Sequence, residues 1–273
     1  MLKSRVVTSV VLATLVLAAL LLLPPIWLSV ALALMFLVAG GWENARLAGV
    51  SNPALQVAWI MLLCVAGGGL IGAAHAPAGL PVILSVATAG WLLLALWLRF
   101  PALGRAGQER FQPAKLLVVA AILLTAFTSI AWMHAISPWL VIHLILIVAA
   151  ADIGAFFAGH RFGGPRLAPV ISPGKTWSGA IGGLVVAMLV APAASLVLPG
   201  IPLTPLFASL VAVPVVAYSI CGDLLISLFK RHRGLKDTSM LLPGHGGMLD
   251  RVDGLSAAAP LFALIVWSVV VGA

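Results

Sequence analysis

Long apolar runs follow one another along almost the whole sequence, and they decide what this chain can fold into. Hydrophobic residues make up 63% of the 273 residues, charged residues only 8%, and the mean hydropathy is +1.20. Soluble domains carry roughly 25% charged residues, whereas a membrane span needs about 20 mostly apolar residues. The composition therefore excludes an ordinary soluble domain and indicates a chain that crosses a membrane many times.

We expect an all-α, polytopic integral membrane protein with about nine transmembrane helices. Pro24-Pro25 separates the first two runs, because proline cannot continue a helix and restricts the residue before it. The first run resembles a signal peptide, but its length and the proline pair after it favour an uncleaved span. The expected spans are Val6–Leu23, Ile26–Gly40, Leu55–Ala74, Leu80–Leu98, Leu116–Ile136, Trp139–Ala158, Ser178–Leu198, Pro205–Leu228 and Ala257–Val271.

The basic residues sort to one side of this arrangement. All 15 lysines and arginines precede the first expected span or follow the second, fourth, sixth or eighth. The opposite connections, such as His75–Gly79 and Pro199–Thr204, contain none. The positive-inside rule then places the N-terminus and every charged loop in the cytoplasm. Topology therefore accounts for the net charge of +8, and we expect no nucleic-acid partner.

Two regions follow from the distribution of polar residues. We expect residues 1–150 to form a helical scaffold and a candidate oligomer interface. Residues 151–273 would hold the reaction centre, with cytoplasmic loops at 159–177 and 229–254. The two cysteines, Cys64 and Cys221, lie inside apolar runs, which argues against a disulfide framework and against a cysteine metal site.

The stretch Ser227–Gly254 concentrates ionisable groups in an otherwise apolar chain. Only seven residues of the chain are acidic, and three of them, Asp237, Asp250 and Asp253, lie here. Asp250 and Asp253 have the i, i+3 spacing that shares one face of a helical turn. With Asp223, just upstream, they supply hard oxygen ligands suited to Mg²⁺, which binds a few carboxylates plus substrate phosphates.

The same stretch contains groups suited to phosphate. Glycines on both sides of His245 let the backbone come close to a ligand. Acids, cations and a glycine-rich turn are typical of phosphoryl or nucleotidyl transfer, in which catalysis is mainly positioning and charge stabilisation. No histidine pair has zinc-ligand spacing, so a zinc site is disfavoured. A solvated charged loop is the simpler alternative. The residues that can neutralise phosphate charge are Lys230, Arg231, Lys236 and Arg251.

A second basic loop follows the sixth expected span. Ser172, Lys175 and Thr176 form a donor-rich cluster before the next helix, which suits a phosphate oxygen. The full P-loop spacing is missing, so nucleotide hydrolysis of that kind is disfavoured. A loop that merely sets topology and contacts anionic lipid is the alternative. Gly179 and Gly183 have the small-xxx-small spacing of closely packed membrane helices.

Two aspartates lie inside expected spans, Asp152 in the sixth and Asp223 in the eighth. A carboxylate in hydrocarbon costs a few kcal/mol or more, so it should face a cavity, an ion or a partner. Both are near the cytoplasmic ends of their spans, within reach of the charged loops. We expect them to belong to the reaction centre, the alternative being simple pairing with Lys175 or Arg251.

These segments resemble a known family. Ser227–Gly254 is similar, position by position, to the signature of phosphatidate cytidylyltransferases, also called CDP-diacylglycerol synthases. Ile171–Gly183, Asp152–Ala155 and Cys221–Asp223 also look like segments of that family, although relatives often carry a longer polar or acidic residue in place of Ser178. The first half is similar only in hydropathy and in Trp42-Glu43. The matching positions of the signature are Ser227, Lys230, Arg231, Lys236, Asp237, Ser239, Leu242, Pro243, His245, Gly246, Gly247, Asp250, Arg251 and Asp253.

The resemblance implies that CTP and phosphatidate react to give CDP-diacylglycerol and pyrophosphate, at a bacterial-type inner membrane with the site facing the cytoplasm. It implies Mg²⁺ as cofactor and leaves a second, monovalent cation and a homodimer open. On this interpretation the central catalytic residues are Asp223, Asp250, Lys230 and Arg251. The metal ligands would be Asp223 and Asp250, supported by Asp253 or Asp152. The substrate-binding residues would be Ser172, Lys175, Thr176, Ser227, Arg231, Lys236, His245, Gly246 and Gly247.

Two alternatives stay open at this point. Another CTP-dependent lipid enzyme, such as a polyprenol kinase or a CDP-archaeol synthase, would use similar groups. A cation or phosphate transporter would use Asp152 and Asp223, but it predicts charges at mid-membrane and an inverted repeat, and the sequence shows neither. A CDP-alcohol phosphotransferase is disfavoured, because its D-G-x2-A-R motif is missing.

Overall fold

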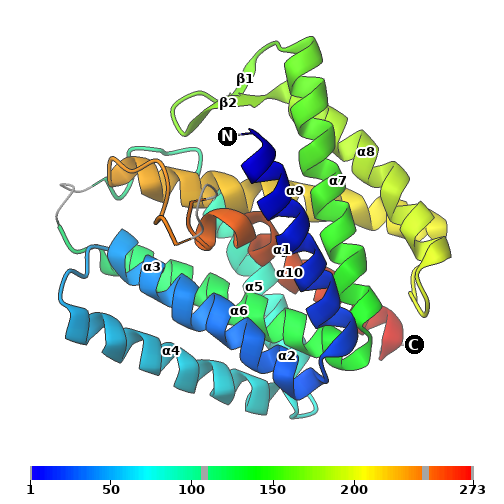
Figure 1. Ribbon diagram of the computed structural model, residues 1–273, viewed down its shortest axis with the longest axis horizontal. Helices are drawn as coiled ribbons and strands as arrows, with labels where there is room; N and C mark the ends of the chain where they lie inside the picture. The colour runs from blue at the N-terminus through cyan, green and yellow to red at the C-terminus, as the bar shows by residue number, and fades with distance from the viewer. Residues whose placement is uncertain (1, 106–109, 242–245, 272–273) are drawn as a thin grey trace.

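The computed structural model is a bundle of helices with one small hairpin (Figure 1), and it describes residues 2–105, 110–241 and 246–271. In chain order the elements are α1 (Leu2–Leu22), α2 (Pro25–Leu32), the π-helical segment η1 (Ala33–Ala39), α3 (Gly40–Leu47), α4 (Pro53–Ala74), α5 (Gly79–Trp97), α6 (Pro113–Ile136), α7 (Pro138–Phe162), β1 (Arg166–Ala168), β2 (Ser172–Thr176), α8 (Trp177–Val197), α9 (Pro205–His232) and α10 (Leu249–Val270).

The helices confirm a polytopic membrane protein. Within the described residues, 8 helices are long and apolar enough to cross a membrane, and they match the expected spans from the second onward. In the region of the first expected span, the apolar helix Ala13–Leu22 is shorter than these. The count of nine and the cytoplasmic N-terminus therefore stay predictions.

Two helices extend beyond the expected boundaries. The second span runs without a break from Pro25 to Leu47, instead of ending at Gly40. The last helix begins at Leu249, instead of Ala257. Hydropathy alone ends a span where polar residues begin, but a helix continues wherever its polar side chains find partners inside the protein. Both extensions carry acidic residues, which become important at the site.

Proline and polar side chains define many helix starts. Proline is tolerated in the first turn of a helix, where its missing N–H has no acceptor to lose, and it occupies the first turn of α2, α4, α6, α7 and α9. The side chains of Asn52, Ser137, Thr176 and Thr204 each accept a hydrogen bond from a backbone N–H of the helix that follows. Such caps satisfy groups that would otherwise lack partners.

A two-stranded antiparallel hairpin joins α7 to α8, a feature that the sequence did not predict. β1 and β2 pair with Arg166 opposite Thr176. Gly163 and Gly164 adopt positive φ angles of 59° and 93°, so the chain can leave α7 sharply without the strain that a Cβ atom would cause. The hairpin fixes Lys175 on a strand beside α9, where a basic loop had been expected (Figure 1).

α7 and α8 form the most extensive helix contact of the fold, and glycines make it possible. A Cβ atom on Gly179 would lie 2.9 Å from the carbonyl oxygen of Ala155, and one on Gly183 would overlap the carbonyl oxygen of Ala151. The close approach expected from the spacing of Gly179 and Gly183 is thus confirmed, and α7 is the partner helix.

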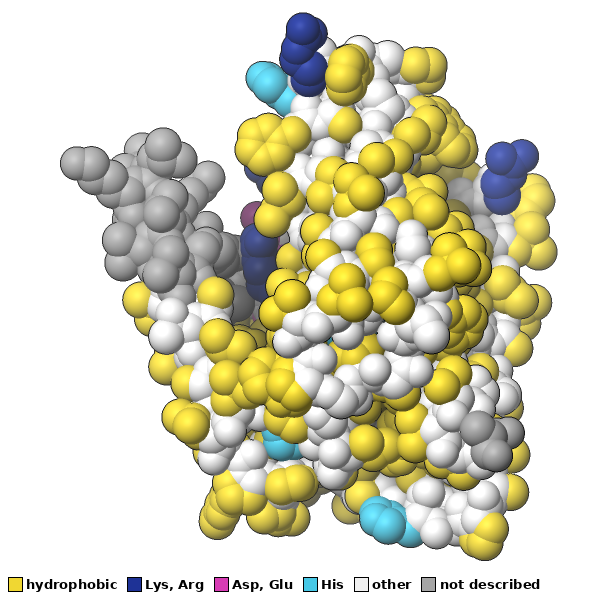
Figure 2. All heavy atoms as spheres, turned by 90° about the vertical axis from the view of Figure 1, so that its right-hand side faces the viewer, with side chains coloured by type: hydrophobic (Ala, Val, Ile, Leu, Met, Phe, Trp, Pro, Cys, Tyr) yellow, Lys and Arg dark blue, Asp and Glu magenta, His cyan; other side chains and the backbone are white. Residues whose placement is uncertain are grey.

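The outer surface is apolar. Along α8 the side chains of Ile181, Val185 and Leu189 are exposed at the i, i+4 spacing of one helix face. Hydrophobic side chains cover much of the face shown in Figure 2, and the Lys and Arg side chains visible there lie in its upper half. An apolar surface of this extent is suited to contact lipid. The polar groups lie at one end of the bundle and in its interior.

Candidate active site

A cavity of about 610 Å³ lies between α7, the hairpin, α8, α9 and α10. It brings together most of the charged residues that the sequence singled out from separate segments. Their side chains face a space large enough for a substrate, because ligand pockets commonly measure roughly 300–1,000 Å³. The expected site residues in its wall are Asp152, Lys175, Thr176, Asp223, Asp250, Arg251 and Asp253.

The two aspartates inside spans reach this cavity from different helices. Asp152 comes from α7, and Asp223 comes from α9, one residue after Gly222. Gly222 is buried against α10, where a Cβ atom would lie 2.7 Å from that of Ala257. This close contact brings α9 and α10 together and places Asp223 beside the acids of α10. Asp152 is exposed and Asp223 is half-buried, and both line this cavity. Asp223 also pairs with Lys175, which is the alternative that the sequence left open.

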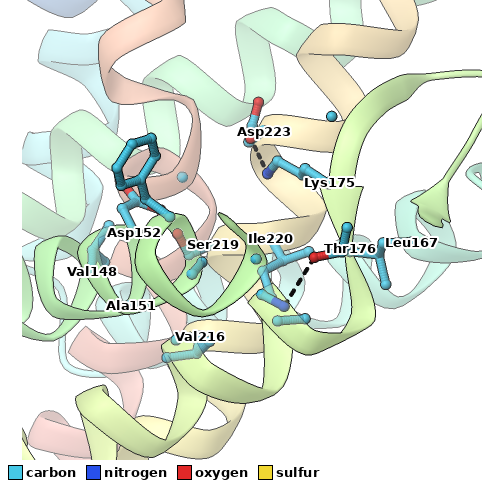
Figure 3. A pocket seen from close by; sticks show the side chains of 18 of the residues that line it. Val148, Ala151, Asp152, Leu167, Lys175, Thr176, Val216, Ser219, Ile220 and Asp223 are labelled. Carbon is cyan, nitrogen blue, oxygen red and sulfur yellow. Dashed lines mark hydrogen bonds and ion pairs between the residues drawn. The ribbon is translucent and has the colours of Figure 1, made fainter. Parts of the chain in front are cut away.

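Lys175 and Asp223 form an ion pair across the cavity. The lysine extends from β2 and points toward the carboxylate on α9 (Figure 3). The side chains are 30% and 34% exposed, so the pair is accessible from the cavity. An accessible ammonium group on a fixed strand is suited to bind an incoming phosphate oxygen.

Asp250 and Lys230 form a second, more deeply buried pair. The Nζ atom of Lys230 lies 2.5 Å from Oδ1 of Asp250, and the side chains are 10% and 6% exposed. Oδ2 of Asp250 accepts hydrogen bonds from the backbone N–H groups of Thr238 and Gly247, at 2.8 Å and 3.1 Å. Asp250 is therefore held at the start of α10 by a lysine of α9 and by the segment between these helices.

Three other expected binding residues lie outside the cavity lining, and two of them contact the protein itself. The hydroxyl of Ser227 lies 3.3 Å from Oδ1 of Asp223. Arg231 donates to the backbone carbonyls of Ile171 and Leu235, so it ties α9 to the hairpin. Lys236 is exposed. None of these three is among the residues that line the cavity.

The remaining expected binding residues also have structural contacts. Ser172 begins β2 outside the cavity lining, and the hydroxyl of Thr176 accepts a hydrogen bond from the N–H of Gly179, which caps α8. Gly246 has a positive φ of 83°. The backbone N–H of Gly247 donates a hydrogen bond to Oδ2 of Asp250. His245 lies outside the described residues.

Several residues of the site went unrecognised in the sequence. His160, Arg166 and Ser219 line the cavity, although each looked like an ordinary member of a basic loop or an apolar run. Glu43 is fully buried and hydrogen-bonds to the segment before α10. The rule that picked out Asp152 would have found Glu43 as well, had the second span been extended to Leu47.

The carboxylate oxygens around the cavity are suited to bind a hard divalent cation. Among the described residues no three His, Cys, Asp or Glu side chains gather as a ready-made metal site. Mg²⁺ is commonly held by one or two carboxylates together with substrate phosphates, and the carboxylates of Asp223, Asp250 and Asp253 face one cavity. Oδ1 of Asp250 has two acceptor sites, of which the bond from Lys230 uses one. Asp223, Asp250 and Asp253 are thus the residues that would hold such an ion.

Comparison with related sequences shows the family of this chain. The model of the cytidylyltransferase family matches residues 3–269, almost the whole chain. The chain belongs to the cytidylyltransferase family. A phosphatidate cytidylyltransferase of Pseudomonas aeruginosa is 37% identical over 271 residues, covering 98% of each chain. One of Haemophilus influenzae is 34% identical over 285 residues, covering 96% of this chain and 98% of the relative.

Membership of the cytidylyltransferase family confirms the resemblance that the signature of Ser227–Gly254 indicated. A third relative, a phosphatidate cytidylyltransferase of Brucella suis, is 48% identical over 132 residues, or 45% of each chain. Because the family model spans the whole chain, the helices of the first half belong to the family as much as the cavity does.

Proposed function

We propose that this chain transfers the cytidylyl group of CTP to phosphatidate, releasing CDP-diacylglycerol and pyrophosphate. The observation that carries the proposal is the convergence of Lys175, Asp223, Asp250, Arg251 and Asp253 on one cavity of a membrane-spanning bundle. Membership of the cytidylyltransferase family, and relatives named phosphatidate cytidylyltransferase, support the nucleotide and the lipid.

The reaction forms one bond and breaks one. A phosphate oxygen of phosphatidate attacks the α-phosphorus of CTP, the bond from that phosphorus to the β-phosphate oxygen breaks, and pyrophosphate leaves with the electron pair. The attacking oxygen is already anionic, so no general base is required. The chain's task is to bring two anions together and to stabilise the charge that develops on the leaving group.

Each charged residue has a place in this scheme. Lys175 and Arg251 line the cavity and would hold phosphate oxygens. Lys230 keeps Asp250 in position by their ion pair, and Ser227 does the same for Asp223 by its hydroxyl. Arg231 fixes the hairpin that carries Lys175. Direct contacts of Ser172, Thr176, Lys236, His245, Gly246 and Gly247 with substrate remain predictions.

A divalent cation fits this scheme. Mg²⁺ bound by Asp223 and Asp250, with Asp253 or Asp152 in support, would neutralise phosphate charge and polarise the α-phosphate. Asp152 lines the same cavity from α7 and completes its acidic side. A monovalent cation beside Mg²⁺ and a homodimer stay open.

The location of the reaction is proposed from charge and from relatives. Eight long apolar helices within residues 2–105, 110–241 and 246–271 make the chain an integral membrane protein, and the named relatives are bacterial. The distribution of lysine and arginine supports an N-terminus and an active site on the cytoplasmic side of the inner membrane. This is also the side on which CTP is available.

The test uses the full chain, purified in detergent, with phosphatidate, Mg²⁺ and CTP labelled either on the α- or on the γ-phosphate. We expect label in the lipid only from α-labelled CTP, together with released pyrophosphate and loss of the reaction on chelation by EDTA. Asp223→Asn should remove the activity, whereas Arg99→Gln, an exposed residue outside the cavity, should retain it.

The two labels separate the proposal from its alternatives. Transfer of the γ-label would identify a lipid kinase and overturn the proposal. Absence of label from the lipid in both arms would overturn it as well. Replacing phosphatidate by a polyprenol or by an ether-linked archaeal lipid in parallel shows which lipid the cavity accepts, and a clear preference for either would contradict phosphatidate as the substrate.

A further inference from the structure

Glu43 is a fully buried carboxylate in α3, in the half of the chain that does not line the cavity. An ionised group in a protein interior is unfavourable unless its oxygens are satisfied. Four donors satisfy them here: the hydroxyls of Thr238 (2.9 Å) and Ser239 (2.5 Å), and the backbone N–H groups of Met248 (2.8 Å) and Leu249 (2.7 Å). All four lie between α9 and the first residue of α10.

Two of these donors are at the start of α10. The first N–H groups of a helix have no acceptor within the helix, and the positive end of the helix dipole favours a negative charge. Met248, at the position before α10, provides no side-chain cap. Glu43 therefore caps α10 from another helix, and among the described residues no lysine or arginine forms an ion pair with it.

Thr238 links Glu43 to Asp250. Its hydroxyl oxygen lies 2.9 Å from Oε2 of Glu43 and 3.0 Å from Oδ2 of Asp250. A hydroxyl has one proton, so the two carboxylates share this donor. The N–H of Thr238 also donates to Oδ2 of Asp250, at 2.8 Å. A displacement of Glu43 would therefore shift two of the contacts that orient Asp250.

Gly247 provides a second link between the same two carboxylates. A Cβ atom at this position would overlap the hydroxyl oxygen of Thr238 and lie 2.7 Å from Oε1 of Glu43, so only glycine fits here. The N–H of Gly247 donates to Oδ2 of Asp250 at 3.1 Å. The sequence suggested that this glycine admits a substrate; in the structure its close neighbours are the hydroxyl of Thr238 and the carboxylate of Glu43.

We propose that Glu43 is a positioning residue for the reaction. Through Thr238 and the backbone of Gly247–Leu249 it fixes Asp250, and with it Lys230, at the cavity wall. This inference rests on the proposed cytidylyl transfer and deepens it, because it makes the site of the C-terminal half depend on a side chain of the N-terminal half.

The test measures kcat per nucleotide-binding site in Glu43→Gln, Thr238→Val and Thr238→Ser. Nucleotide sites are counted by titration with labelled CTP in the absence of phosphatidate, and the melting temperature is recorded in the same detergent. Thr128→Val is the matched control, since Thr128 is an equally buried threonine of α6 outside the cavity lining.

Loss of a hydrogen bond that orients a functional carboxylate commonly lowers activity about 10- to 100-fold. We expect a decrease of this size in kcat per site for Thr238→Val and Glu43→Gln, with rescue in Thr238→Ser, which retains the hydroxyl. Because both changes break one chain of contacts, the double variant should lose little more than the worse single variant. Thr128→Val should keep its kcat.

An unchanged kcat per site in Thr238→Val and Glu43→Gln, with or without a lower melting temperature, would overturn the proposal, because Glu43 would then act on stability alone. If Glu43→Gln does not fold, Thr238→Val and Thr238→Ser decide by the same criterion. Failure of the proposed function is a separate result: the unsubstituted chain would then bind CTP or melt normally but transfer no α-label.

Discussion

The ammonium group of Lys175, on strand β2, lies against the carboxylate of Asp223, on helix α9. In this state each neutralises the other inside the cavity. A nucleoside triphosphate carries more negative charge than the Asp223 carboxylate and would attract Lys175 more strongly. A divalent cation carries more positive charge than the Lys175 ammonium group and would attract Asp223 more strongly. Binding of both would replace one ion pair by two, so the nucleotide and the cation can compete with this pair for its two side chains.

Replacing Lys175 by alanine should lower kcat/KM for CTP by about 100-fold or more, the usual effect of removing one donor that stabilises transition-state charge. Steady-state transfer of α-label into lipid measures it. Arg99→Gln, which removes an exposed positive charge elsewhere, is the control. If both variants have the same activity, Lys175 does not bind the nucleotide.

The buried pair of Lys230 and Asp250 should respond differently to single and double replacement. Lys230→Met leaves a carboxylate that is only 6% exposed without its cation, and breaking a buried pair from one side destabilises a protein by about 3–5 kcal/mol. Lys230→Met combined with Asp250→Asn removes both charges and should recover most of the melting temperature. Neither variant should transfer label.

Equal melting temperatures for the single and the double variant would show that the unpaired Asp250 carboxylate is not what destabilises Lys230→Met. Recovery of activity in the double variant would contradict a catalytic part for Asp250. The two readouts therefore separate what the pair does for the fold from what it does for the reaction.

The close packing of α7 on α8 predicts opposite effects for two glycine substitutions. A Cβ atom on Gly154 would lie 2.8 Å from Cγ2 of Val186 and 3.0 Å from the carbonyl oxygen of Gly182. Gly154→Ala should therefore destabilise the bundle, since overpacking costs about 1–3 kcal/mol and exceeds the helix-propensity gain of about 1 kcal/mol. Gly69→Ala, where a Cβ atom meets nothing within 4 Å, should be neutral or stabilising. Thermal melting compares the two.

The predicted orientation can be tested with single cysteines in a chain whose Cys64 and Cys221 are replaced by alanine. Ala76 lies in the uncharged connection between α4 and α5, and Ala102 follows α5 near Arg99. Both are exposed. A membrane-impermeant maleimide should label Ala76→Cys in intact spheroplasts and Ala102→Cys only after permeabilisation. The reverse pattern would place the N-terminus and the charged loops outside.

Hydropathy predicted most of the fold, because the bilayer requires long apolar helices whatever their partners. It failed where a helix continues through polar residues. The second span was expected to end at Gly40, yet it continues to Leu47 because the carboxylate of Glu43 finds four donors in a segment far along the chain. Contacts at such distances have no signature in local hydropathy.

The site, like the fold, was predictable from the sequence only in part. Membrane-buried aspartates and clustered cations were sufficient to predict that Asp152, Asp223 and Asp250 share a polar centre. The roles of hydroxyl and backbone groups were not predictable, since they depend on tertiary contacts. Thr176, expected to bind phosphate, also caps α8, and Arg231, expected to do the same, also ties α9 to the hairpin. Their contacts with substrate stay predictions.

The capping of α10 by Glu43 has a consequence for how the chain is made. Leu249, one of its donors, follows Glu43 by 206 residues, so at about 5–20 residues per second the carboxylate waits roughly 10–40 seconds for this partner to be synthesised. During that interval an acid in an otherwise apolar span has no native partner from α10. We expect α3 to remain at the membrane interface or beside the insertion machinery until α10 emerges, so that the site is completed only when α10 reaches the membrane.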